Sequence, residues 1–155
     1  FDAVISHHNL EHCYDMENNL FFLIRSLKKG GRLFLKFPCE ESISFPSRKG
    51  TLNFFDDPTH TTFPPEYSRI LYLLNMHGVK IEYCVKRSRP LILAFVGMLL
   101  EPLSKHLDKV FPCTWEYYGF ETVIIARKKT LYSRWETAIV FASIGKIRFF
   151  LRDTP

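Results

Sequence analysis

The chain contains 155 residues, of which 46% are hydrophobic and 24% are charged, and 21 Lys and Arg against 16 Asp and Glu give a net charge of +5. These proportions exclude a disordered chain, and no apolar run reaches the ~20 residues that a membrane-spanning helix needs. The modest positive charge permits an acidic partner without requiring one. Cys13, Cys39, Cys84 and Cys113 lie far apart without a CxxC pair, which is typical of reduced thiols in the cytoplasm.

The first third of the sequence predicts a strand, a helix and a second strand. Residues 1–6 (FDAVIS) are apolar enough for a strand that is buried on both faces of a sheet. Residues 15–29 place leucine and isoleucine on one helical face, with Asp15 as the N-cap and Gly30 after the last turn. Residues 32–37 form the second strand. The short connections indicate a βαβ unit, whose two strands are parallel and joined by a right-handed crossover.

The rest of the sequence predicts a long loop, two strands and three helical segments. The loop covers residues 39–62, and a loop of this length is more often functional than decorative. The other elements are a helix from Pro65 to residue 77, a strand at 79–85, an apolar helix or lid at 91–100, a strand at 118–127 and a helix at 130–150. Fifteen phenylalanines predict an aromatic-rich core. Because Phe1 already lies inside a strand-like run, we expect the chain to be a piece of a longer protein.

Several segments of the sequence occur in an order that is typical of one protein family. They are Phe1-Asp2, Leu10-Glu11-His12, Lys28-Lys29-Gly30-Gly31 with the strand that ends at Pro38, Asp57-Pro58-Thr59-His60, and the strand at 118–128. In this order they resemble the second half of class I S-adenosylmethionine-dependent methyltransferases, over about residues 1–86 and 116–129. The resemblance implies an α/β fold with a partial Rossmann-like sheet, mostly parallel, whose final strand is antiparallel.

The first half of that family has no counterpart in this sequence, because neither its glycine-rich turn nor its ribose-binding acid is present. We therefore expect residues 1–129 to be the C-terminal part of a methyltransferase domain, with a helical insertion at 87–116 and a helical tail at 130–155. The strand at 1–6 would then be an open edge that can pair with another chain. We expect a homodimer, a complementing N-terminal fragment or poor solubility, and negligible affinity for the cofactor.

The resemblance implies an enzyme that transfers a methyl group from S-adenosylmethionine to a small-molecule or glycan-type acceptor. Ligands of such sheets bind beyond the carboxyl ends of the strands, so Ser6, His7 and His8 are the expected cofactor-binding residues. His12 and His60 are the candidates for catalytic proton transfer, because histidine titrates near neutral pH. The alternative for His12 is a structural role beside the helix that follows it.

Three other interpretations remain. A catalytically silent relative would serve as an oligomerising or binding module. The basic clusters at 86–89 and 127–129 could contact RNA, but no aromatic-basic signature accompanies them, and we expect no nucleic-acid partner. The histidines and the cysteine of residues 7–13 could bind zinc, with His8 and His12 at i, i+4 spacing. An HExxH motif on a helix is absent, so we expect no metal site there.

Overall fold

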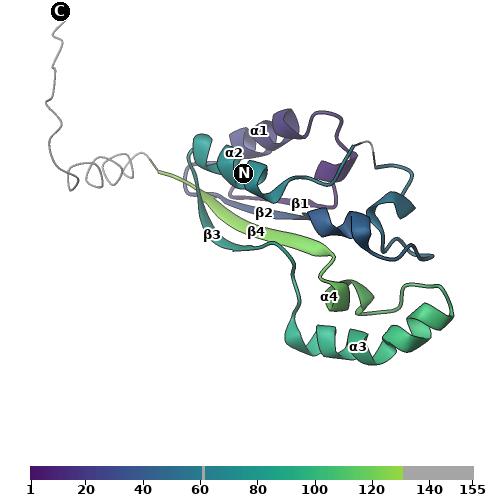
Figure 1. Ribbon diagram of the computed structural model, residues 1–155. Coiled ribbons are helices and arrows are strands. Elements are labelled where there is room, and N and C mark those ends of the chain that lie inside the picture. Colours follow the sequence, from purple (N-terminus) through teal and green to yellow (C-terminus); the bar gives the residue numbers. More distant parts are fainter. Residues whose placement is uncertain (61, 131–155) are drawn as a thin grey trace, which may run out of the picture.

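The protein is an α/β structure built on one four-stranded sheet, seen in a computed structural model that describes residues 1–60 and 62–130. Its strands are β1 (Ala3–His7), β2 (Arg32–Pro38), β3 (Val79–Val85) and β4 (Glu121–Lys128), in the spatial order β1-β2-β4-β3. β1 and β2 are parallel, and β4 runs antiparallel to both β2 and β3 (Figure 1). The expected fold class, with an antiparallel final strand, is confirmed.

The helices lie in two places relative to the sheet. α1 (Met16–Ser26) and α2 (Tyr67–Met76) cover one face, whereas α3 (Leu91–His106) and α4 (Thr114–Tyr118) lie beyond the end where β3 finishes and β4 begins (Figure 1). Short 3-10 helices occupy the loops, as η1 (Leu10–His12), η2 (Glu40–Ser44) and η3 (Phe54–Asp56). None of the helices in the described ranges has the length and apolar character needed to cross a membrane. The tail expected at 130–155 lies, apart from its first residue, outside the described residues.

The main core lies between the sheet and the helices α1 and α2. Its fully buried side chains are mainly aliphatic and include Leu20, Leu33, Leu35, Ile70, Leu74 and Ile124. The buried phenylalanines of the described residues are Phe37, Phe45, Phe54 and Phe120. The prediction of an aromatic-rich core is therefore wrong for this main core. It is confirmed for a second, smaller core, where Trp115 and Tyr118 pack against Phe45 and Phe120.

The first strand is less buried than its sequence predicts. β1 lies at the edge of the sheet. Its side chains alternate, as in any strand, between a buried face, which holds Ser6, and an exposed face. Ile5 is 73% exposed, because none of the described helices covers that second face. The prediction of a strand buried on both faces is wrong for this part of the chain, whereas the open edge is confirmed.

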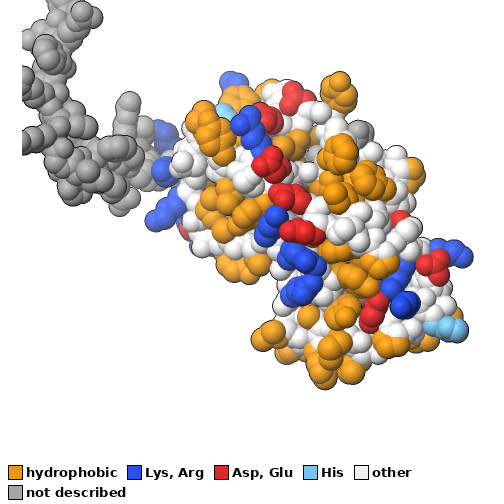
Figure 2. Space-filling model, viewed as in Figure 1, with side chains coloured by type: hydrophobic (Ala, Val, Ile, Leu, Met, Phe, Trp, Pro, Cys, Tyr) orange, Lys and Arg blue, Asp and Glu red, His pale blue; other side chains and the backbone are white. Residues whose placement is uncertain are grey.

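The apolar segment after residue 90 forms α3 and packs on α4. Gly97 lies at the contact: a Cβ atom placed there would meet the backbone oxygen of Cys113 at 2.1 Å. This close approach requires glycine and fixes α4 beside α3. The outer face of α3 stays apolar, with Leu91 and Ile92 the most exposed, and Figure 2 shows hydrophobic side chains gathered at this end of the molecule.

Two predicted boundaries need correction. α2 begins at Tyr67 with Glu66 as its N-cap, so Pro65 precedes the helix instead of opening it. β4 begins at Glu121 instead of residue 118, because the chain first completes α4 and turns at Gly119, whose φ is +65°. The N-cap of α1 is confirmed, since the Asp15 side chain accepts a hydrogen bond from the backbone of the helix.

Candidate functional site

A pocket of about 180 Å³ opens beside the carboxyl ends of the parallel strands β1 and β2. Its lining residues are His8, His12, Pro38, Thr51, Asp57, His60, Trp115 and Phe120. They come from the segment after β1 that includes η1, from the end of β2, from the long loop, and from α4 and the turn before β4. Three of the five residues selected from the sequence, His8, His12 and His60, thus share one pocket.

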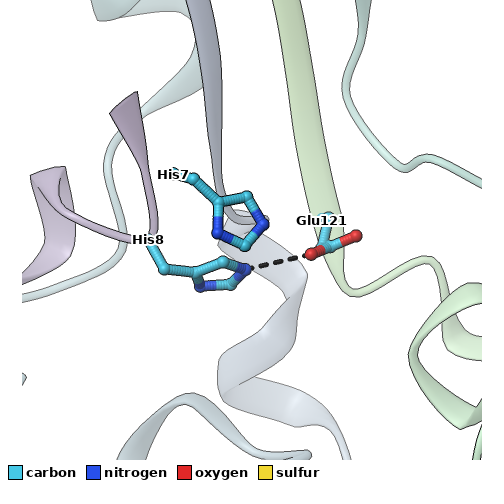
Figure 3. Close-up of side chains that lie close together, drawn as sticks. All are labelled: His7, His8 and Glu121. Atoms are coloured by element: carbon cyan, nitrogen blue, oxygen red, sulfur yellow. Dashed lines mark hydrogen bonds and ion pairs between the residues drawn. The ribbon is translucent and has the colours of Figure 1, made fainter. Parts of the chain in front are cut away.

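His8 lies at the centre of a charged cluster. It follows β1 in the left-handed backbone region, with φ of +47°, and its backbone N–H donates to the Lys36 carbonyl at 2.9 Å. Its ring lies between two carboxylates, with Nδ1 2.9 Å from Glu11 and Nε2 3.0 Å from Glu121. Figure 3 shows the His8 ring directed at Glu121, with His7 beside it. Both ring nitrogens are therefore engaged.

The two carboxylates make His8 a cation at neutral pH. Burial of the ring opposes protonation, but the hydrogen bonds that the ring donates to Glu11 and Glu121 outweigh it and raise the pKa of His8 to about 9. Burial also acts to raise the pKa of Glu121, but His8 and Lys36 outweigh this effect and hold that pKa below its ordinary value. The second oxygen of Glu121 accepts from Lys36 Nζ at 2.7 Å. The side chains of the cluster therefore form a row of alternating negative and positive charges, in the order Glu11, His8, Glu121, Lys36.

Ser6 and His7, the other two expected cofactor residues, do not line the pocket. The Ser6 side chain is buried, and its Oγ has no hydrogen-bond partner among the described residues. His7 is exposed on the neighbouring side, with its ring centroid 4.6 Å from that of His8. Partial burial, together with the charge of His8, lowers the pKa of His7. A ligand at the end of β1 would therefore meet the free hydroxyl of Ser6, the neutral imidazole of His7 and the imidazolium of His8.

His12 and His60 lie side by side in the lining of the pocket, with ring centroids 4.9 Å apart and ring planes tilted by 45°. The His60 ring stacks on Phe54 at 4.0 Å, and its Nδ1 lies 2.5 Å from the Phe54 carbonyl oxygen. Nδ1 of His12 lies 3.3 Å from the Thr59 carbonyl oxygen. Because a carbonyl only accepts, each Nδ1 carries the hydrogen, and each Nε2 presents a lone pair.

The long loop that carries His60 is held at several points. Asp56 accepts hydrogen bonds from the backbone N–H groups of Arg48, Leu52 and Asn53, at 3.1, 3.1 and 2.8 Å. The Arg48 guanidinium in turn binds both carboxylate oxygens of Glu101 on α3, at 2.6 and 2.8 Å. These contacts tie the loop to α3 and hold the turn that precedes His60.

Sequence reasoning missed the residues contributed by α4, by the turn after it and by the start of β4. Trp115 and Phe120 stack at 4.9 Å and form an apolar wall beside His8, and Trp115 Nε1 donates to the Thr51 carbonyl at 3.0 Å. Glu121 partners His8 from the first position of β4. The available signal was the acidic residue at the start of an otherwise apolar strand.

Members of both basic clusters considered for RNA make ion pairs within the chain. Lys86 pairs with Glu40 at 2.7 Å and with Glu41 at 3.2 Å. Arg127 pairs with Glu82 at 2.6 Å. Lys86, which follows β3, therefore links the end of this strand to η2. Arg127 links β4 to β3.

No protein-family model and no curated protein sequence matches the chain. Among solved structures it is similar to a SAM dependent methyltransferase from Archaeoglobus fulgidus, with 21% identity, a TM-score of 0.43, and coverage of 83% of this chain and 59% of that chain. It is similar to a putative sarcosine dimethylglycine methyltransferase from Galdieria sulphuraria, with 15% identity, a TM-score of 0.49, and coverage of 83% and 53%.

A third similar structure is the [4+2]-cyclase SpnF, with 16% identity, a TM-score of 0.46, and coverage of 84% of this chain and 50% of that chain. The chain therefore spans between half and three-fifths of the length of these structures.

Proposed function

We propose that the chain is the acceptor-side part of a cytoplasmic S-adenosylmethionine-dependent methyltransferase that acts on a small-molecule or glycan-type acceptor. The observation that carries this proposal is the convergence of His8, His12 and His60 on one pocket at the carboxyl ends of parallel strands, where ligands of open α/β sheets bind. The ordered sequence segments that resemble this family support it. The four cysteines of the described residues are free thiols, which supports the location.

The cofactor would supply the electrophilic methyl group, and the residues at the end of β1 fit it in part. Ser6 fits, because its buried Oγ has hydrogen-bonding capacity to spare. His7 is exposed and accessible to a ligand. His8 fits only through the face of its ring, because both nitrogens already donate to Glu11 and Glu121. A glycine-rich turn would have to come from outside this chain.

His12 and His60 are suited to the acceptor side of the reaction. Each presents Nε2, which can accept the proton of an acceptor hydroxyl as its oxygen takes the methyl group; such general-base catalysis contributes roughly 10²–10⁴-fold. Trp115 and Phe120 supply an apolar wall on which a sugar or a ring can lie. The pocket holds the acceptor in line and limits the access of water.

An NMR titration with S-adenosylhomocysteine tests this proposal. At millimolar ligand we expect fast-exchange shifts of the amide signals of Ser6, His7 and His8. We expect no shifts at His77, the C-cap of α2, or at His106, the last residue of α3. Calorimetry on the same sample should give no measurable heat, because the binding is weak. Shifts confined to other elements would contradict the proposed cofactor side, and tight binding would show that this chain needs no complement.

We further propose that the free side of β1 pairs with a second copy of the chain or with a complementing N-terminal fragment. Phe1 and Ile5 are each 73% exposed at this edge, where apolar side chains favour association. Light scattering should give a mass above that of the monomer, and Ile5→Lys should lower it. A monodisperse monomer of the unaltered chain would contradict the proposal. A catalytically silent binding module, the second candidate function, would use the same edge.

A further inference from the structure

We propose that Glu11, His12 and His60 form a binding site for a divalent transition-metal ion on the wall of the pocket. One carboxylate oxygen of Glu11 and one ring nitrogen of each histidine lie within 4.8 Å of one another. Two imidazole nitrogens and one carboxylate oxygen are a ligand set for Mn²⁺, Fe²⁺, Co²⁺ or Zn²⁺. Both histidines already line the pocket, so an ion held by them would face its interior.

The state of Glu11 is the strongest argument for a cation here. Its side chain is fully buried, and only Oε1 has a partner, the Nδ1 atom of His8 at 2.9 Å. Oε2 is buried without a hydrogen-bond donor among the described residues. A buried carboxylate oxygen that lacks a donor is costly, and a bound cation removes this cost.

The two histidines are oriented as metal ligands usually are. A ligating histidine commonly donates its other ring N–H to a backbone carbonyl, which fixes the ring and its tautomer. Here Nδ1 of His60 lies against the Phe54 carbonyl and Nδ1 of His12 against the Thr59 carbonyl, so both Nε2 atoms are available. Oδ2 of Asp57 lies 4.0 Å from Nε2 of His60, within reach of the same ion.

Small side-chain rotations would bring the ligand atoms of Glu11, His12 and His60 to the spacing that a bound ion requires. Metal–nitrogen and metal–oxygen bonds of ~2.0–2.2 Å place ligand atoms ~3–4 Å apart, slightly closer than the present spread. A second group of potential ligands, His7, His8 and Glu121, also lies within 4.8 Å. It is unsuitable, because both nitrogens of His8 donate to carboxylates, whereas a ligating histidine must be neutral.

An ion with three protein ligands keeps open positions for a ligand from the pocket. It would bind a hydroxyl or phosphate oxygen of the acceptor and lower the pKa of a bound hydroxyl, whose proton would pass to water at the mouth of the pocket. His12 and His60 would then orient the acceptor through the ion instead of accepting its proton directly. This role rests on the proposed function, whereas binding of the ion does not.

Titration of the chelator-treated, dialysed chain with MnCl₂ and with ZnCl₂ tests the site. Calorimetry for both ions, and electron paramagnetic resonance for Mn²⁺, should show one ion per chain. His12→Gln and His60→Gln should each weaken binding by at least ~10–100-fold, because each removes a ligand. His106→Gln, at an exposed histidine on α3, is the matched control and should bind as the unaltered chain does.

The site is overturned if neither ion binds stoichiometrically, or if both pocket variants bind as tightly as the control. Circular dichroism spectra of the variants separate loss of the ligand from loss of the fold. Glu11→Gln, which keeps the side-chain shape, adds a third test of the same ligand set. Ion binding without the S-adenosylhomocysteine shifts at Ser6, His7 and His8 would contradict the cofactor side of the proposed function while leaving the ion site in place.

Discussion

Replacing His8 with asparagine is expected to lower the free energy of unfolding by ~3–5 kcal/mol, because it leaves two buried carboxylates without their shared cation. Glu11 is fully buried and Glu121 is 6% exposed, so neither can recover the lost hydrogen bond from water without disturbing the core. Asparagine is the suitable replacement, since it tolerates the left-handed backbone that His8 adopts. Urea denaturation at pH 7 in the presence of chelator measures the effect.

His7→Asn is the matched control for this variant. His7 is the adjacent histidine, but it is exposed and has no carboxylate within hydrogen-bond distance among the described contacts, so its loss should change stability by less than ~0.5 kcal/mol. Equal losses for the two variants would contradict the account of the cluster. A His8→Asn chain as stable as the unaltered one would contradict it equally.

The same cluster predicts how stability depends on pH. The pKa of His8 rises from 6.5 in the unfolded chain to about 9 in the folded chain. Its contribution is therefore complete below about pH 6.5 and is lost as the pH rises through 9. The unaltered chain should lose stability between pH 7 and 9, whereas His8→Asn should show a weaker dependence over that range.

The elements that follow from local patterns could be predicted from the sequence. The apolar spacing of α1 with its Asp15 cap, the alternation of β3 and the apolar run of β4 each depend on neighbouring residues only, and each element is present. Burial of β1 could not be predicted in this way. Whether Ile5 is covered depends on which helices lie over the second face of the sheet, and this is a property of the whole fold.

The same distinction between local pattern and whole fold applies to the candidate site. His8, His12 and His60 could be selected because they lie in a loop after a strand and in a long loop that faces the same edge. The partners that set their chemistry are distant in sequence: Glu121 lies 113 residues from His8. A single sequence carries no sign of this pairing, so the charge of His8 follows only from the three-dimensional arrangement.

Replacing Arg48 with methionine is the second change with a large expected effect, a loss of ~3–5 kcal/mol. The Arg48 side chain is 4% exposed, and its guanidinium binds Glu101 with two hydrogen bonds and Ser104 Oγ with a third, at 2.7 Å. Methionine fills similar space but leaves the Glu101 carboxylate, itself 16% exposed, with the Tyr118 hydroxyl as its remaining hydrogen-bond donor among the described residues. Thermal and urea denaturation measure the loss.

The exposed pair of Arg69 and Glu17 offers a matched control. It also has two hydrogen bonds, at 2.6 and 3.0 Å, but its side chains are 44% and 47% exposed. Arg69→Met should therefore cost much less stability than Arg48→Met, because water screens the pair and solvates the carboxylate that remains. Similar losses for Arg48→Met and Arg69→Met would show that burial does not set the strength of the Arg48 contact.

A double variant separates the charge from the packing at Arg48. Arg48→Met with Glu101→Met removes both charges, so it should be more stable than Arg48→Met alone, which leaves a carboxylate unpaired. Arg48→Lys should recover little, because one ammonium group cannot replace the two-pronged contact of a guanidinium. If the pair serves mainly to hold the long loop against α3, the double variant should also keep the NMR signals of His60 close to those of the unaltered chain. A large change in these signals would show that the charges themselves position His60.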